Sequence, residues 1–172
     1  METTNNKLTE EQEIFIREIS SYLDTKFYYF GSVQRPDYLP GKSDIDVDIF
    51  TENEASTIAK LVHFLHVDKK DIKQTVTRIG RNNQIVNGHK LKYKNKFIQL
   101  EICIYNEKFK KYILTEHTSK MVLPFYCTWL LNVLKVLYYQ LHILPLSSYV
   151  FLKRHILAVG NGLKNEGQFV VL

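Results

Sequence analysis

Two segments near the start of the chain show apolar residues every three or four positions. These segments, 9–23 and 53–66, have the period of helices that bury one side. Each is preceded by a Thr-x-x-Gln or Thr-x-x-Glu pattern, beginning at Thr9 and at Thr51. Such a pattern is typical of a capping box at a helix N-terminus. The sequence therefore predicts two amphipathic helices, each opened by a threonine cap.

Other segments alternate apolar and polar positions or are rich in aromatic and β-branched residues, as strands are. They are 27–33, 44–50, 72–80, 84–94 and 97–105. A short turn around Asn95 predicts a hairpin between the last two. Residues 107–159 return to helical spacing, with one helix beginning at Pro124 and another spanning about 147–158.

Together these elements predict an α/β (α+β) fold. We expect a short, mixed, twisted sheet flanked by helices, with C-terminal helices completing it. A length of 172 residues suits one compact domain. We therefore expect a single domain over 1–172, with a core at about 9–106 and a C-terminal helical part at about 107–160.

The most apolar segment, 121–146, approaches the length of a membrane span. Asn132, Lys135, Gln140 and His142 interrupt it, and such residues are costly in lipid. We therefore expect no membrane contact, but a buried helix or a subunit contact through which the chain could form an oligomer. The polar, acidic N-terminus lacks the features of a signal peptide, and the two cysteines lie within apolar runs. A cytoplasmic protein is expected.

Charge is unevenly distributed along the chain. Residues 1–60 hold 6 Lys/Arg and 12 Asp/Glu, whereas residues 61–172 hold 17 and 6, so the two parts carry −6 and +11. An acidic cluster beside a basic remainder suits a site that collects divalent cations and then a polyanion, although solvated surface could give the same totals.

The acidic cluster has a regular spacing. In the run DIDVDIF, Asp44, Asp46 and Asp48 alternate with apolar residues, so a strand would place the three carboxylates on one face, about 7 Å apart. Their mutual repulsion calls for cations or solvent. An EF-hand is excluded because Ile49 and Ala55 replace its required Gly and Glu. An acidic edge strand that opposes aggregation remains an alternative.

Upstream of this run, Gly31-Ser32 ends an aromatic segment, and a short loop then leads to Ser43-Asp44-Ile45-Asp46. This arrangement resembles the signature of the polymerase-beta-type nucleotidyltransferase superfamily. The resemblance implies that Gly31, Ser32 and Ser43 contribute to nucleotide binding. It also implies that Asp44 and Asp46 bind two Mg²⁺ ions, for which Mn²⁺ could substitute, together with a third carboxylate from a later strand.

Glu101 is the candidate for that third carboxylate. In FIQLEICIY the apolar residues alternate, so Glu101 points away from them and is the only acid of an otherwise uncharged strand. Such a charge needs a partner or a metal. We predict a metal ligand, with a salt bridge to a nearby lysine as the alternative.

Two assignments stay open within the acidic run and the loop before it. DIDVD holds two overlapping Asp-x-Asp motifs. The resemblance favours Asp44 and Asp46 and leaves Asp48 as an additional metal-ligand candidate. Arg35 and Lys42 lie in the loop, where they could bind the triphosphate or simply be solvated.

Further basic residues are candidates for phosphate or acceptor binding. Lys90, Lys92, Lys94 and Lys96 alternate along one predicted strand. Such a stripe could follow a nucleic-acid backbone, but an edge strand guarded by lysines has the same pattern. Lys153, with the arginine after it, is a second candidate.

Two other kinds of site are not expected. No Walker A or Rossmann motif is present. Among the six histidines, only His63 and His66 have metal-ligand spacing, so no zinc site is predicted.

The resemblance to the nucleotidyltransferase superfamily implies transfer of a nucleoside monophosphate from a nucleoside triphosphate, ATP among the candidates, to an acceptor hydroxyl. Nucleic acid is one acceptor that the basic composition favours. The alternatives are a protein-modifying or antitoxin-like small nucleotidyltransferase, and a catalytically silent nucleotide-binding or scaffold module.

Overall fold

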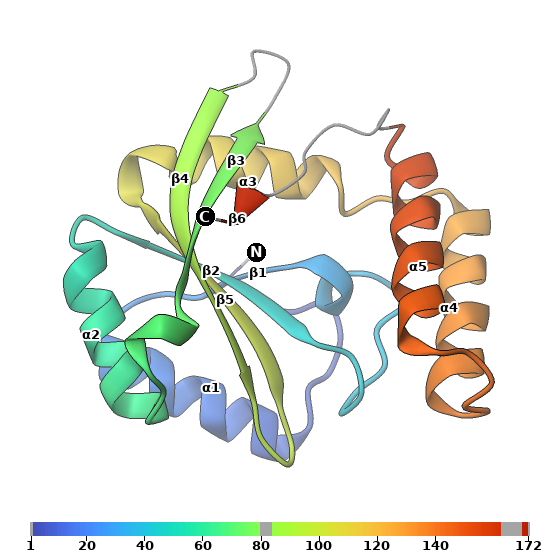
Figure 1. The fold of residues 1–172 in the computed structure, drawn as a ribbon, viewed down its shortest axis with the longest axis horizontal. Coiled ribbons are helices and arrows are strands. Elements are labelled where there is room, and N and C mark those ends of the chain that lie inside the picture. The colour runs from blue at the N-terminus through green and yellow to red at the C-terminus, as the bar shows by residue number, and fades with distance from the viewer. Residues whose placement is uncertain (1, 80–83, 163–169, 172) are drawn as a thin grey trace.

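The computed structural model describes residues 2–79, 84–162 and 170–171 of the chain (Figure 1). The described strands are β1 (Tyr28–Phe30), β2 (Ile45–Thr51), β3 (Lys73–Ile79), β4 (Gln84–Lys94), β5 (Gln99–Asn106) and β6 (Val170–Val171). The described helices are α1 (Glu10–Leu23), α2 (Glu54–Leu65), α3 (Lys110–Ser119), α4 (Phe125–Tyr139) and α5 (Leu146–Gly160).

The strands form one six-stranded sheet in the order β1-β2-β5-β4-β3-β6. Only the β2–β5 pair is parallel among the described pairings, so the sheet is mixed, as predicted. The short strand β6 was not predicted from the sequence. The parallel register places Asp46 directly opposite Glu101.

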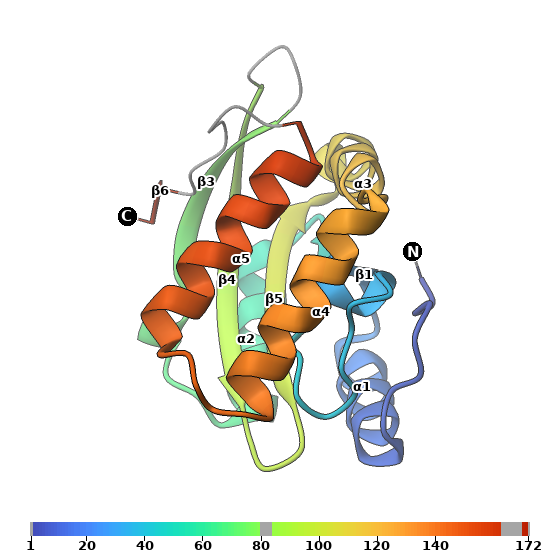
Figure 2. The ribbon, with the colours of Figure 1, turned by 90° about the vertical axis from the view of Figure 1, so that its right-hand side faces the viewer.

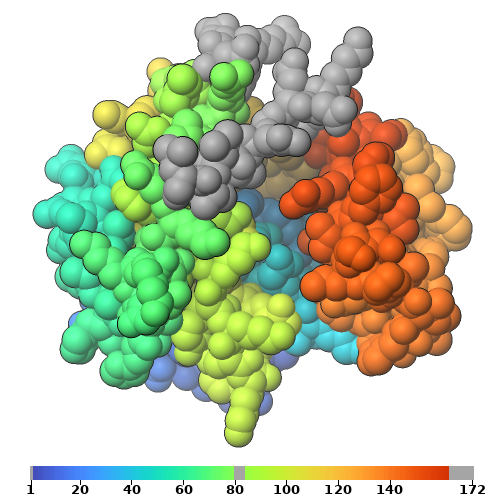
Figure 3. Space-filling view, in the orientation of Figure 1, coloured from blue at the N-terminus to red at the C-terminus, as the bar shows by residue number. Residues whose placement is uncertain are grey.

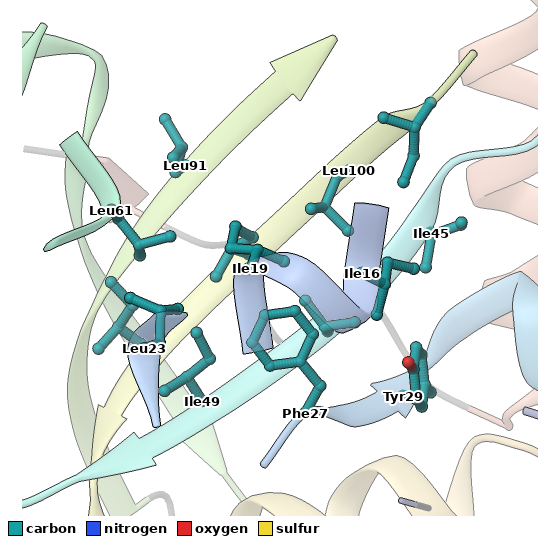
Figure 4. Close-up of a cluster of buried hydrophobic side chains, with 14 of the residues drawn as sticks. Ile16, Ile19, Leu23, Phe27, Tyr29, Ile45, Ile49, Leu61, Leu91 and Leu100 are labelled. Atoms are coloured by element: carbon teal, nitrogen blue, oxygen red, sulfur yellow. The ribbon is translucent and has the colours of Figure 1, made fainter. Parts of the chain in front are cut away.

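One face of the sheet packs on α1 and α2 and forms the larger core (Figure 4). Ile19 of α1 and Leu61 of α2 are fully buried there. The sheet contributes alternate residues of the parallel strands β2 and β5: Ile45, Val47, Ile49, Leu100, Ile102 and Ile104. Burial of these side chains holds β2 and β5 in register, so their polar residues must point to the opposite face.

The opposite face is only partly covered by helix. Tyr28, Phe50, Cys103 and Tyr105 form a second cluster with Ile113 of α3. The α4–α5 hairpin stands beside the sheet, next to the loop that leads into β2 (Figures 1 and 2). The start of β2 therefore lies at the side of the sheet that is next to the hairpin.

Two element boundaries differ from the predictions. The strand predicted for 27–33 ends at Phe30, and Gly31–Gln34 form a 3₁₀ turn, because Gly31 adopts a φ of +69° that a strand does not use. The Thr51 cap is also wrong. Thr51 is the last residue of β2, and the side chain of Asn53 accepts from the Ser56 N–H to cap α2.

Other local predictions are confirmed. Thr9 and Gln12 form the capping box of α1. The Asn95 side chain accepts hydrogen bonds from the N–H groups of Phe97 and Ile98 and closes the β4–β5 hairpin.

Among the helices of the described residues, none combines the length and apolar character needed to cross a bilayer.

Candidate active site

The Gly-Ser turn lies directly against the first Asp-x-Asp motif. A Cβ atom on Gly31 would lie 2.0 Å from Oδ2 of Asp46, so only glycine leaves room for this carboxylate. The positive φ of Gly31 adds a second reason for glycine. The buried Ser32 hydroxyl lies 3.5 Å from the carbonyl oxygen of Asp44. The turn and the start of β2 therefore form one unit.

Three carboxylates lie close enough together to influence one another. Asp46 and Glu101 face each other across the parallel β2–β5 pair, and Asp44 precedes β2. Burial raises the pKa of Asp46 well above its usual value, and the negative charges of Asp44 and Glu101 raise it further. The site therefore favours a proton or a cation beside Asp46.

Glu101 points away from the apolar core, as predicted, and towards the lysines of β4. Its carboxylate forms an ion pair with Lys90 and a second one with Lys92, whose Nζ lies 3.2 Å from Oε2. The salt bridge considered from the sequence is therefore present. Within the described residues, no group of three His, Cys, Asp or Glu side chains is arranged to hold a metal ion. The metal-ligand role of Glu101 stays a prediction.

Asp48, the last acid of the run, has a different environment. It is fully buried, and its Oδ2 lies 2.9 Å from Nδ1 of His117 on α3. The His117 ring stacks on Phe30, with ring centroids 4.1 Å apart. Burial raises the pKa of Asp48, and the His117 contact opposes that rise. The structure therefore brings Asp48 to a histidine that the sequence analysis left without a partner.

The loop between the Gly-Ser turn and β2 is built around a buried acid, Asp37. The Arg35 side chain donates to both Asp37 oxygens, at 2.8 and 3.3 Å. Lys135, from α4, places its Nζ 3.0 Å from Asp37 Oδ2 and donates to the Ser43 hydroxyl at 3.2 Å. Burial alone would raise the pKa of Asp37, but Arg35 and Lys135 bring it below its usual value.

This network changes the interpretation of two predicted nucleotide-binding residues. Arg35 is only 7% exposed and is engaged by Asp37, and the Ser43 hydroxyl accepts from the Leu39 N–H and from Lys135. Both have internal partners, which the sequence analysis did not foresee because it left Asp37 out. Lys42, in contrast, is exposed.

A hollow opens between the sheet and the α4–α5 hairpin. Figure 3 shows it between the yellow-green β4–β5 surface and the orange-red α5, with blue to cyan atoms of the β1–β2 region at its floor. From the α5 side, Nζ of Lys153 approaches Oδ1 of Asp44 to 4.0 Å. Lys153, a modest candidate by sequence, is thus brought to the carboxylates.

Two cavities lie away from the predicted site residues. One of about 440 Å³ is bordered by residues of the N-terminal segment, α1 and β1, and one of about 510 Å³ by residues that include Asp24 and Lys110. Neither is lined by any of the predicted site residues. These two cavities are therefore separate from the carboxylates at the start of β2.

The family assignment follows from the sequence match. The profile of the family described as "Nucleotidyltransferase domain" matches residues 11–122, a range that contains the Gly-Ser turn, the acidic run and Glu101. The chain belongs to this nucleotidyltransferase domain family. The superfamily and the fold class predicted from the sequence are thereby confirmed.

Comparisons with curated proteins and solved structures do not narrow the assignment beyond the family. No curated protein matches the chain. Among solved structures, the crystal structure of the Cid1 poly(U) polymerase is similar, with 15% identity, a TM-score of 0.41, and coverage of 77% of this chain and 42% of that one. The structure of the GLD-2/RNP-8 complex is also similar, with 14% identity and a TM-score of 0.41. The match covers 87% of this chain and 55% of that one. The chain thus spans about half the length of these structures, and similarity at this level says nothing about its substrate.

Proposed function

We propose that this chain transfers a nucleoside monophosphate from a nucleoside triphosphate to an acceptor hydroxyl, with pyrophosphate leaving. The observation that carries the proposal is the position of Asp46, which faces Glu101 across β2 and β5 and lies against Gly31. The proposal treats the chain as a single-domain minimal nucleotidyltransferase.

The charges of the three carboxylates suit a divalent-cation site, although Glu101 pairs with Lys90 in the structure and the described residues show no three acids arranged around one point. Asp46 has a raised pKa because it is largely withdrawn from solvent and lies near the charges of Asp44 and Glu101, and bound cations would relieve that repulsion. Mg²⁺, or Mn²⁺ in its place, would bind to Asp44, Asp46 and Glu101, with Lys90 giving up its ion pair to Glu101. Two such ions would supply charge neutralisation and a lowered pKa for the acceptor hydroxyl. The pairing of Asp48 with His117 argues against Asp48 as a direct ligand.

The residues around the carboxylates suit a triphosphate. The backbone of Gly31 and Ser32 turns beside Asp46, where N–H groups can bind phosphate oxygens and orient the leaving group. Lys42 from the loop and Lys153 from α5 would add positive charge from two sides. Arg35 is not part of this set because Asp37 engages it.

Nucleic acid is the acceptor that the surface charge favours. Lys92 of β4 is largely exposed, with 77% of its side chain accessible. On the neighbouring strand β3, Lys73 lies directly opposite Lys90 of β4. Basic side chains on this face can contact a phosphate backbone. A protein acceptor is the alternative, and binding to RNA that weakens steeply with salt would argue against it.

A catalytically silent module is the second candidate function. It is favoured by one observation, the ion pair between Glu101 and Lys90, because a carboxylate neutralised by lysine needs no metal. The two candidates differ in whether Mg²⁺ can displace the lysine.

The experiment is incubation with Mg²⁺ and each labelled nucleoside triphosphate, offering RNA, DNA and the protein itself as acceptors. Asp46→Asn should abolish transfer, whereas Glu52→Gln, an exposed acid outside the site, should leave it unchanged. Triphosphate binding without transfer would support the silent module. Absence of both transfer and Mg²⁺-dependent triphosphate binding would refute the metal site.

A further inference from the structure

The outer side of α4 carries an apolar stripe, here called the α4 stripe. Its residues recur at helical spacing and are exposed: Phe125, Tyr126, Trp129, Leu130, Val133 and Val136. Phe125 is 86% exposed and Trp129 is 64% exposed. Soluble monomers rarely expose a contiguous apolar surface of this kind, so it marks an interaction site.

The α4 stripe bears no charge. Lys135 is the only charged residue in α4, and it is turned inward, 1% exposed, to contact Asp37 and Ser43. The whole chain nevertheless carries a formal charge of +5. Two copies would repel each other through most of their surfaces, but no like charges would meet where one α4 stripe faces another.

The area of the stripe is large enough for a stable dimer. An aromatic side chain can bury about 150–250 Å², and the stripe contains three of them. Leu141 and Ile143, which follow α4, are 56% and 66% exposed and extend the surface. Together these residues present an area on the order of 800 Å², the amount that each partner of a standard interface buries.

We propose that two copies of this chain associate through their α4 stripes, with the two helices antiparallel around a two-fold axis near Val133. One patch then meets itself, which is the commonest symmetry of homodimers. The 15-residue helix is about 22 Å long, so the pairing covers the stripe from Phe125 to Val136 and reaches Leu141. This deepens the expectation of an oligomer through 121–146 by naming the surface and the symmetry.

Trp129 is the only tryptophan of the chain and lies within the proposed interface, so it reports directly on it. We expect light scattering after gel filtration to show a dimer, with Trp129 emission that shifts to shorter wavelength as concentration rises. Val133→Glu should give a folded monomer with red-shifted emission that does not depend on concentration. Ile14→Glu, at a 46% exposed site on α1, is the matched control and should leave the dimer intact.

Cysteine cross-linking tests the symmetry. Cys103 and Cys127 are buried and free, so an introduced cysteine is the accessible one. Val133→Cys should form a disulfide-linked dimer under mild oxidation, because the two copies of residue 133 lie beside the axis. Phe125→Cys should not, because its two copies would be about 24 Å apart in the antiparallel pair, far beyond the roughly 7 Å limit between bridged Cα atoms.

Three outcomes would overturn the proposal. One is a monomer at all concentrations with Trp129 open to acrylamide quenching. Another is a dimer that survives Val133→Glu, which would place the contact elsewhere. The third is a monomer that floats with phospholipid vesicles, which would make a lipid surface the partner. Circular dichroism of Val133→Glu checks that loss of the dimer is not loss of the fold.

Discussion

Nζ of Lys135 lies 3.0 Å from Oδ2 of Asp37, although the two residues are 98 positions apart in the sequence. Asp37 is 0% exposed and Lys135 is 1% exposed, and Arg35 completes the group from within the loop. This contact ties α4 to the loop that leads into Asp44. The C-terminal hairpin therefore contributes to the geometry of the candidate site even though its own residues include no acid.

Removal of Lys135 should destabilise the fold strongly. Lys135→Met leaves Asp37 with one cationic partner in a buried setting, and breaking such a pair costs about 3–5 kcal/mol. Denaturant unfolding should show this loss. The double variant Asp37→Asn, Lys135→Met should not recover it, because the buried Arg35 is then left without a carboxylate partner. Equal stability of the single variant and the wild type would show that the contact does not form.

The same acid predicts a pH dependence of stability. The pKa of Asp37 is lowered in the folded state by Arg35 and Lys135 against the effect of burial. The ionised form therefore contributes stability that is fully present above the unfolded-state pKa, about 3.9. It is lost as the pH falls through the lower folded-state pKa. The difference in unfolding free energy between wild type and Asp37→Asn should be constant near pH 7 and shrink below about pH 4. A difference that grows on acidification would contradict the lowered pKa.

Gly31→Ala should lower label transfer more than the cost of the backbone conformation alone explains. The new Cβ would meet Oδ2 of Asp46 at 2.0 Å, in addition to the cost of a positive φ, which is about 1–2 kcal/mol. Gly162→Ala is the matched control, since Gly162 has a φ of +62° and no heavy atom within 4 Å of an added Cβ. Both variants should lose stability, but only Gly31→Ala should also lose label transfer by about 100-fold or more, since small misplacements of reacting groups cost that much. Equal loss of transfer in the two variants would remove Gly31 from the site.

Lys90 and a divalent cation should compete for Glu101. Lys90→Met removes the closer of the two ion pairs to Glu101, so Mn²⁺ binding followed by electron paramagnetic resonance should tighten by about tenfold, corresponding to roughly 1.4 kcal/mol. Lys94→Met, on an exposed position of the same strand, should leave Mn²⁺ affinity unchanged. Unchanged affinity in Lys90→Met would indicate that Glu101 is not a metal ligand.

Much of the site could be predicted because it depends on local patterns. Alternation along DIDVDIF and FIQLEICIY placed the apolar residues in the core and Glu101 on the opposite face, as the structure shows. The Gly-Ser turn and its distance to the acidic run led to the family that the profile match confirms. The capping box at Thr9 is likewise a contact within one helical turn.

The failed or missing assignments involve longer contacts. The Thr51 cap was wrong because β2 continues through that residue, where it pairs with Asn106. Arg35 was left open between triphosphate binding and solvation, because nothing local reveals that Asp37 is buried beside it. In the sequence, His117 and Lys135 are polar residues within helical patterns, and nothing near them predicts their contacts with Asp48 and Asp37.

The sequence by itself therefore determined the approximate positions of β1 to β5, which face of β2 and β5 carries the carboxylates, and the family. The tertiary structure alone decided the partners of the buried charges. It brought Lys135 to Asp37, His117 to Asp48 and Lys90 to Glu101. Side-chain period is a property of one element and can be read along the chain. The partner of a buried charge depends on how separate elements pack, which local spacing does not encode.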